Sequence, residues 1–375
     1  MSRLDRPSIV PPAIAALPWP RIFLLSALAC FGATVLFSAA GGKLLPWALP
    51  HLIRFGGALA LSLAIGALSL RFIRRASWPI YVATLALLVL VELIGGIGGG
   101  SQRWLNLGFM TLQPSELMKP AIVLVIAAFF DRLPPARVRS FDAIWPPLGL
   151  LAVPFFLVLI QPDLGTSLAV AAGAIVVCFL AGIPMRLFVG AGAVLALVAP
   201  LAFFFGLHDY QRRRVTTFLT PEADPLGAGY HISQSKIAIG SGGLTGKGFL
   251  NGTQSHLDYL PEGHTDFVFA TMAEEWGFVG GVALLIGFGL LLAWGVRVAM
   301  ASPSRFGQLA AGGLTFTIFF YMLVNLLMVM GLAPVVGIPL PFMSHGGSSM
   351  LTIMLCVGVI FAVERDAKRP RGSFD

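Results

Sequence analysis

The chain has 375 residues, of which 57% are apolar and 11% are charged, and its formal net charge is +8. Soluble domains carry roughly 25% charged residues, so this composition excludes a soluble globular protein. The positive charge is explained by Arg and Lys that face anionic lipid on the cytoplasmic side of a membrane, and it does not call for nucleic acid as a partner. The three cysteines lie inside apolar runs, which argues against a disulfide framework.

In chain order, the polar, proline-rich segment 1–20 comes first and predicts a cytoplasmic tail. Apolar runs long enough to cross the hydrocarbon core as helices then recur along the sequence. We therefore predict an all-α polytopic membrane protein, a bundle of about ten transmembrane helices in one domain over 21–363, and a second cytoplasmic tail over 364–375. The predicted spans are 21–40, 50–70, 78–95, 114–131, 145–161, 164–183, 186–206, 267–299, 306–331 and 341–363.

The basic residues of the short loops predict the orientation. An inside N-terminus places most of them in the cytoplasm, whereas the opposite short loops hold Lys43 and Arg103, with Arg54 and Lys119 nearby. The positive-inside rule therefore predicts that both termini are cytoplasmic. The long polar loop over 207–266, between the seventh and eighth helices, is then extracytoplasmic.

This outer loop is too long to be a plain connector. Its stretch 230–239 has partly amphipathic spacing and predicts a helix that lies on the membrane. The glycine-rich run Gly240–Gly248 follows and invites comparison with a phosphate-binding loop. That motif needs an earlier Gly where Ser241 stands, and Ser or Thr where Gly248 stands, so we reject it.

Asp266 closes the outer loop just before an apolar stretch that begins at Phe267, so we expect it where water meets the membrane. One interpretation is an N-cap, because Asp is a favoured capping residue. The other is a catalytic proton acceptor, hydrated enough to ionise and sheltered enough to be tuned. The two roles are compatible, and Asn would retain only the first.

Two further acidic positions precede or open predicted spans. Glu116 and Lys119 are three residues apart and therefore neighbours on one helix face. They either neutralise each other within the bundle or contact a lipid head group, with Lys119 near a phosphate. Asp163 follows Gln-Pro at an outer turn, where turn chemistry alone explains it. Its position also brings it to the same membrane face as Asp266.

Each of the remaining candidate residues also has a purely structural interpretation. Trp104 is either an interfacial belt residue or a platform for a sugar ring, and Arg103 beside it is a candidate phosphate ligand. The run Arg212–Arg214 either meets lipid phosphates or attracts a diphosphate head group. Ser344 opens the last span in a Gly- and Ser-rich segment that suits either helix packing or sugar binding. His264 with Asp266 is too little to define a metal site, although outer carboxylates suit a divalent cation, Mg²⁺ or Mn²⁺, near a diphosphate.

Together these motifs resemble the SEDS family of cell-wall polymerases (shape, elongation, division and sporulation proteins). The run 229–244 is more similar to the rod-shape member RodA than to the division member FtsW, and Gly263 departs from the bulkier residue familiar there. The segments that carry the resemblance are Gly-Ser-Gln-Arg-Trp-Leu at 100–105, Gln-Pro-Ser-Glu at 113–116, Gln-Pro-Asp-Leu-Gly-Thr at 161–166, Leu-Pro-Glu-Gly-His-Thr-Asp-Phe at 260–267 and Pro-Phe-Met-Ser-His-Gly-Gly-Ser-Ser at 341–349.

The resemblance implies a glycosyltransferase that polymerises lipid II outside the cytoplasmic membrane during cell elongation. It implies ten transmembrane helices, a class B penicillin-binding protein as transpeptidase partner, and association with the elongation machinery. The family's essential Asp falls on Asp266 and its sensitive Trp on Trp104. We expect Asp266 to be the general base of an inverting reaction. The expected substrate-binding residues are Trp104, Arg103, Glu116, Lys119, Asp163, Arg212, His264 and Ser344.

A lipid II flippase is the main alternative, because many helices and buried acidic residues fit that class too. A flippase needs a polar path across the midplane and two access states. The suspicious polar residues here gather at the outer face, which favours chemistry outside the membrane. A scaffold that only anchors a partner enzyme is a third class, and it would tolerate the loss of Asp266.

Overall fold

The structure is a computed structural model that describes residues 17–94, 96–98, 101–106, 111–201, 203, 212, 216–218, 220, 228–257, 259–260 and 262–368. Most of the predicted N-terminal tail, the end of the C-terminal tail and much of the outer loop before residue 228 lie outside these ranges. Each predicted span corresponds to one helix, and the described part of the outer loop also contains the helices α10 and α11. The helices are α2 (Trp19–Ala39), α3 (Ala48–Gly66), α4 (Leu70–Ile94), α5 (Pro114–Arg132), α6 (Trp145–Ile160), α7 (Leu164–Ala181), α8 (Met185–Leu201), α10 (Ala228–Gly242), α11 (Thr253–His256), α12 (Val268–Ala301), α13 (Arg305–Val329) and α14 (Gly347–Ala367).

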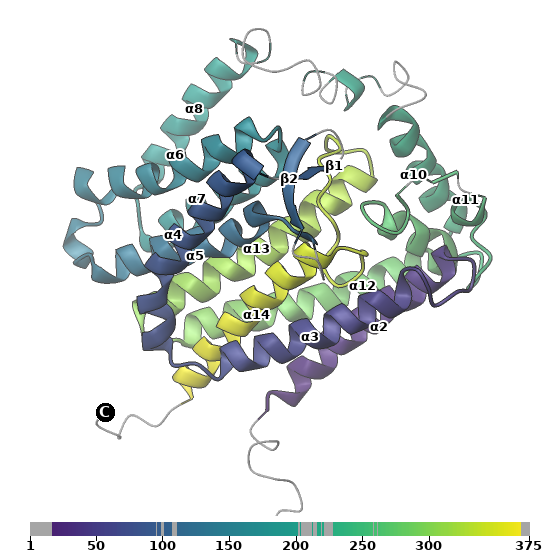
Figure 1. The fold of residues 1–375 in the computed structure, drawn as a ribbon, viewed down its shortest axis with the longest axis horizontal. Helices are drawn as coiled ribbons and strands as arrows, with labels where there is room; N and C mark the ends of the chain where they lie inside the picture. Colours follow the sequence, from purple (N-terminus) through teal and green to yellow (C-terminus); the bar gives the residue numbers. More distant parts are fainter. Residues whose placement is uncertain are drawn as a thin grey trace, which may run out of the picture.

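Hydropathy explains most of this architecture. Among the described residues, seven helices are long and apolar enough to cross a membrane, namely α2, α3, α4, α7, α12, α13 and α14. The helices α6 and α8 are apolar but shorter, and α5 has charged residues near both ends. The side chains of α8 are nearly all exposed, and Figure 1 shows this helix apart from the centre of the bundle, as expected for a lipid-facing element. The chain is a mostly helical multi-pass membrane protein.

Some observed helix boundaries differ from the predicted ones for identifiable reasons. Helix α4 begins at Leu70 rather than near 78, because Pro79 lies inside it without ending it. Helix α14 begins at Gly347 rather than 341 and continues to Ala367, so Glu364 belongs to a buried helix end and not to a tail. Helix α10 forms where an amphipathic segment was predicted, but it packs against α12 and α13 and buries Ser235.

The all-α prediction is wrong in one place. Three short strands, β1 (Gly96–Gly98), β2 (Ser101–Asn106) and β3 (Thr111–Leu112), form an antiparallel sheet in the order β1-β2-β3. Trp104 pairs with Gly96, and Leu105 pairs with Leu112. The strands are too short and glycine-rich for an alternating pattern to reveal them. The sheet packs against α4 and α5 and so holds the Trp104 segment over the end of the bundle.

Close helix packing relies on small residues. Figure 1 shows α14 beside α3, and a Cβ added at Gly66 would lie 2.8 Å from the Cβ of Phe361. At the same end, Arg365 donates hydrogen bonds to the carbonyls of Ala67 and Leu68, both at 2.6 Å, and so satisfies the C-terminal end of α3. Small residues allow backbones in a membrane to approach closely, which fixes the α3–α14 pair.

The glycine-rich run of the outer loop completes a broken helix. Helix α12 is interrupted at Gly277, whose φ of 61° and ψ of −157° suit only glycine. The N–H groups of Lys247 and Gly248 bond the carbonyls of Glu274 and Glu275, both at 3.0 Å, and Phe278 N–H bonds the Gly243 carbonyl at 2.9 Å. We call residues Gly243–Gly248 the glycine insert. It satisfies backbone groups that the break leaves unpaired.

Replacing Gly246 with Ala should destabilise the protein by roughly 2–4 kcal/mol, from overpacking and a positive φ. Its φ is 80°, and an added Cβ would lie 2.0 Å from the Glu275 carbonyl oxygen. Gly240→Ala is the matched control, because a Cβ there meets nothing within 4 Å. The thermal unfolding midpoint in detergent should fall by several degrees for Gly246→Ala alone. Equal midpoints for the two variants would contradict this account of the insert.

Candidate active site

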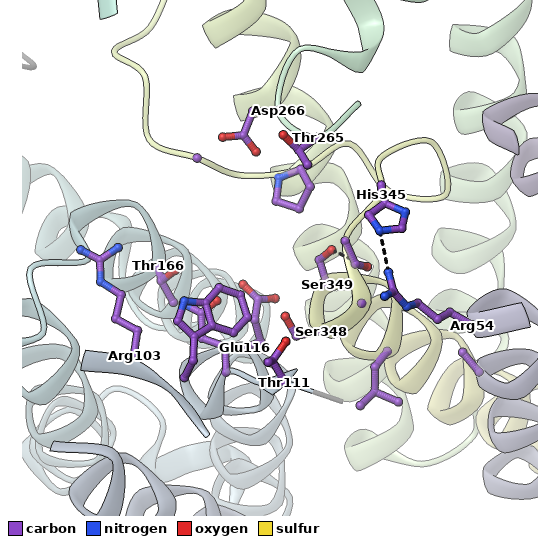
Figure 2. A pocket seen from close by; sticks show the side chains of 18 of the residues that line it. Arg54, Arg103, Thr111, Glu116, Thr166, Thr265, Asp266, His345, Ser348 and Ser349 are labelled. Atoms are coloured by element: carbon purple, nitrogen blue, oxygen red, sulfur yellow. Dashed lines mark hydrogen bonds between the residues drawn. The ribbon is translucent and has the colours of Figure 1, made fainter. Parts of the chain in front are cut away.

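A cavity of about 930 Å³ lies where several helices begin, and Figure 2 shows side chains around it. It is walled by α3, by the first turns of α5, α7 and α14, by the sheet, by the turn before α12 and by the segment 336–339. The residues that line it are Arg54, Gly57, Ala58, Leu61, Arg103, Trp104, Thr111, Gln113, Glu116, Asp163, Thr166, Glu262, Thr265, Asp266, Val336, Gly337, Pro339, His345, Gly346, Gly347, Ser348, Ser349 and Leu351.

Asp266 lies on the turn before α12, half-buried, with its carboxylate at the cavity (Figure 2). The N-cap position of α12 falls on Phe267, one residue after the position that the capping interpretation assumed, and the Phe267 side chain makes no capping hydrogen bond. The backbone is held instead: Asn325 Nδ2 donates to the carbonyls of Asp266 and Ile338, both at 2.8 Å. The fold therefore holds the main chain at Asp266 and presents its side chain to the cavity.

Glu116 reaches the cavity from a buried cluster. Lys119 Nζ donates to Glu116 Oε1 at 2.5 Å and to the Tyr321 hydroxyl at 2.6 Å, and that hydroxyl donates to Glu116 Oε2. The Lys119 ammonium also lies 4.3 Å from the centroid of the Tyr321 ring. Lys119 is only 1% exposed and does not line the cavity, so the predicted phosphate contact by Lys119 does not fit this structure. In the structure Lys119 instead neutralises Glu116, which is the first of its two interpretations.

Asp163 combines both of its interpretations. It caps α7 by accepting a hydrogen bond from Thr166 N–H at 3.1 Å, and it also lines the cavity. Gln113 Nε2 donates to its other oxygen at 3.0 Å. Arg103 lies 3.9 Å from that oxygen, and its guanidinium also donates to the carbonyls of Gln161, at 2.7 Å, and Pro162. Arg103 therefore lines the cavity with its Nε and Nη2 engaged by the α6–α7 turn.

Trp104 lines the cavity from β2 and is half-buried. Its main chain is fixed by pairing with Gly96. The aromatic face therefore stands on a fixed strand across the cavity from the Asp266 turn. This position suits a platform for a sugar ring, since apolar sugar faces stack on indole.

The structure does not bring three other predicted residues to the cavity. Ser344 accepts a hydrogen bond from Leu340 N–H at 2.8 Å and donates to the Thr265 carbonyl at 2.6 Å, so its hydroxyl is used to hold the Asp266 turn. His264 stacks on Trp47, with ring centroids 4.1 Å apart and planes 7° apart. Arg212 donates to the Phe203 carbonyl at 2.9 Å. Arg213 and Arg214 lie outside the described residues.

Arg54 and His345 line the cavity but were not predicted as site residues, and Ser348 and Ser349 line it from the segment whose hydroxyls were predicted to suit either helix packing or sugar binding. Arg54 had a usable signal, since an ionisable residue within an apolar span is a functional hypothesis by default. It was treated only as a charge that reports topology. Figure 2 shows Arg54 and Arg103 on opposite sides of the cavity, with a hydrogen bond between Arg54 and His345. Only Arg54 approaches the first residue of α14, where the Gly347 Cβ would be 3.7 Å from its Nε.

The helix ends contribute positive electrostatic potential at the cavity wall, beside the carboxylates that also line it. The helices α5, α7, α12 and α14 all begin at its wall. No side chain caps α5, α12 or α14, whereas Asp163 caps α7. Unpaired N–H groups and the helix dipole favour anions at such ends. The cavity therefore suits a ligand with a strongly anionic group.

The described acidic residues of the cavity do not form a metal site by themselves. Within the described ranges, no three His, Cys, Asp or Glu side chains converge as a metal site would require. Asp266, Glu262, Glu116 and Asp163 all line the cavity, but Glu116 is engaged by Lys119 and Asp163 by Gln113 and Arg103. A divalent ion there would take most of its ligands from phosphate and water, as Mg²⁺ often does.

The chain is similar to known proteins over nearly its whole length. The FtsW/RodA/SpoVE family model, described as a cell cycle protein, matches residues 22–369. Peptidoglycan glycosyltransferase MrdB of Escherichia coli K12 is 44% identical over 353 residues, covering 92% of this chain and 93% of the relative. Stage V sporulation protein E of Bacillus subtilis 168 is 39% identical, covering 75% of this chain and 76% of the relative.

Two solved structures have the same fold. A chain from a peptidoglycan synthase complex that coordinates polymerization and crosslinking matches with a TM-score of 0.82 and 35% identity, covering 95% of this chain and 99% of that chain. The rod-shape-determining protein RodA of Thermus thermophilus matches with a TM-score of 0.69 and 31% identity, covering 96% and 100%. The protein described here belongs to the FtsW/RodA/SpoVE family.

Proposed function

We propose that the protein is an inverting peptidoglycan glycosyltransferase that polymerises lipid II, the undecaprenyl-diphosphate-linked disaccharide peptide, into glycan strands at the outer face of the cytoplasmic membrane during cell elongation. The observation that carries the mechanism is the cavity, which combines the carboxylate of Asp266, the guanidinium of Arg54 and four converging helix N-termini. The name of the E. coli relative, a peptidoglycan glycosyltransferase, supports the same activity.

The acceptor sugar hydroxyl is a poor nucleophile at neutral pH and needs a positioned base. Asp266 takes its proton as the hydroxyl oxygen bonds to the anomeric carbon of the donor, a contribution of roughly 10²–10⁴ in rate. The bond from that carbon to the diphosphate oxygen breaks, and the electron pair leaves with the lipid diphosphate. Direct displacement inverts the donor carbon, so an α-linked donor gives a β-linked product.

The leaving group is already anionic, so it needs positive charge more than it needs an acid. Arg54 and the uncapped start of α14 supply that charge at one wall of the cavity. Their electrostatic attraction to the leaving group becomes stronger as negative charge develops on the departing oxygen. Trp104 and Ser349 line the space where the sugars lie. Arg103, Asp163 and Glu116 shape that space and fix its electrostatics through the contacts described above.

We place the cavity at the extracytoplasmic side, with both termini in the cytoplasm and with α5, α6 and α8 completing ten spans. The helices α5 and α14 begin at the cavity, and the basic residues Arg132 and Arg365 lie in their last turns. Arg74 pairs with Asp131 at 2.7 Å near the same end. This asymmetry follows the positive-inside rule. The residues 207–266 are then the extracytoplasmic loop.

A class B penicillin-binding protein and the elongation machinery are the proposed partners. The solved peptidoglycan synthase complex, in which polymerization and crosslinking are coordinated, supports a partner that crosslinks. A glycan polymerase and a transpeptidase act on the same nascent strand, so their association shortens the path between the two reactions. The proposed interaction requires no nucleic acid.

Purified protein mixed with lipid II in detergent separates the two main functions. A polymerase should convert the lipid to glycan chains that lengthen with time, detected on gels with a fluorescent substrate. A flippase has no bilayer to act across and should leave the lipid unchanged. Absence of glycan from protein that is folded, tested alone and with its transpeptidase partner, would refute the proposed function.

A further inference from the structure

His345 joins the cavity arginine to the neighbouring turn. Its Nε2 lies 3.0 Å from Arg54 Nη1, and its Nδ1 lies 3.3 Å from the Trp47 carbonyl oxygen. A guanidinium can only donate, so Nε2 accepts and Nδ1 carries the proton. The neutral Nδ1–H tautomer therefore satisfies both contacts. The His345 backbone N–H donates to the His264 carbonyl at 2.9 Å, which holds the ring in place.

We propose that His345 is a positioning residue whose neutral form holds Arg54 toward the end of the cavity that binds the anionic diphosphate. Protonation of His345 then releases this arginine. Acidification of the outer side would then weaken capture of the diphosphate substrate. The inference rests on the proposed function, because it assigns the Arg54 end of the cavity to the diphosphate.

Protonation removes the contact for two reasons. The imidazolium has donors on both nitrogens and no acceptor for Arg54. It also places a second positive charge beside a guanidinium, without an intervening anion in that contact. The His345 ring cannot move away to relieve the repulsion, because it is already held through Trp47 and the His264 main chain. Arg54, on an exposed part of α3, is the group that moves.

The charged surroundings of His345 keep it neutral near pH 7. Helix α3 contributes Arg54 and His51, and the turn before α12 contributes His264, whose ring centroid is 6.4 Å away. Burial lowers the pKa of His345 below its ordinary range, and the charge of Arg54 lowers it further. Burial also lowers the pKa of His264, against the opposing effect of Glu262. Release therefore occurs on the acid side of the ordinary histidine range.

The test is the pH dependence of kcat/KM for lipid II polymerisation by the full-length protein, because this ratio reports groups of the free enzyme. Wild-type protein should lose activity in a first, upper acid step below pH ~6.5, before any loss at lower pH that other groups cause. His345→Gln should lose the first step, because its amide oxygen accepts from Arg54 but does not titrate. His345→Ala should raise KM about tenfold near pH 7, consistent with a lost hydrogen bond to a charged group, and this difference from wild type should shrink below the acid step.

His264→Gln is the matched control, since it removes a nearby histidine that does not contact Arg54, and it should keep the upper acid step. A His345→Gln profile with the wild-type upper step would overturn the proposal. So would an unchanged KM in His345→Ala that elutes as folded protein. If His345→Ala does not fold, the His345→Gln profile decides. Wild-type protein that makes no glycan at any pH would instead refute the proposed function.

Discussion

Asp266→Asn should abolish glycan polymerisation while the protein still inserts and folds. Asn has nearly the same shape, and the hydrogen bonds to the Asp266 and Thr265 carbonyls, which help to hold this turn, are unaffected by the substitution. What the variant lacks is a group that accepts a proton from the acceptor sugar. Loss of a positioned base costs roughly 10²–10⁴ in rate. The measurement is the initial rate of glycan formation from lipid II by purified protein.

Glu262→Gln is the matched control for this experiment. Glu262 lines the same cavity from the same turn, and it accepts a hydrogen bond from the Thr265 hydroxyl at 2.5 Å, but it is exposed to solvent. We expect that variant to retain most of its activity. Appreciable polymerisation by Asp266→Asn would remove the base assignment. A loss in Glu262→Gln as large as that in Asp266→Asn would make the turn, rather than the one carboxylate, the essential feature.

Lys119→Met, in the buried cluster behind the cavity wall, should produce a large loss of stability. It leaves the buried Glu116 carboxylate without its cation and the Tyr321 hydroxyl without one of its donors. Removing one partner of a buried ion pair costs about 3–5 kcal/mol, because the remaining charge is uncompensated. Thermal unfolding in detergent should show this as a large fall in midpoint.

The double variant Glu116→Gln/Lys119→Met should recover part of that loss, since neither charge is then left alone. A double-mutant cycle measures the coupling between the two positions. Lys368→Met is the control, because Lys368 also pairs with a Glu, at 2.7 Å, but its side chain is 68% exposed. Exposed pairs contribute about 0–1 kcal/mol. Equal effects at Lys119 and Lys368 would contradict the buried-cluster account.

Hydropathy was sufficient to predict the helices, because each transmembrane span must carry a long apolar run of its own. Two features without such a signal were missed. The sheet around Trp104 consists of strands of two to six residues, which have no room for a pattern. The break at Gly277 depends on the distant glycine insert, and a single glycine among the 43 of the chain gives no local signal of a helix break.

The site was predicted where residues precede or open helices. Asp266, Glu116 and Asp163 line the cavity because a helix start fixes the level of a residue in the membrane, whereas Arg103 and Trp104 line it from strand β2. Sequence position does not fix the direction of a side chain. Lys119, Ser344 and His264 therefore lie at the right level but point into packing contacts, while Arg54 reaches the cavity from the second turn of α3.

The convergence of four helix N-termini on one cavity has a cost for turnover. Backbone dipoles are permanent, so the attraction that assists bond breaking persists once the bond is broken. In the proposed reaction the spent polyprenyl carrier keeps the same two phosphates as the incoming one, so we expect it to compete for this region. Escape of the used carrier sideways into the bilayer should then limit processive synthesis, and added undecaprenyl diphosphate should act as a competitive product inhibitor.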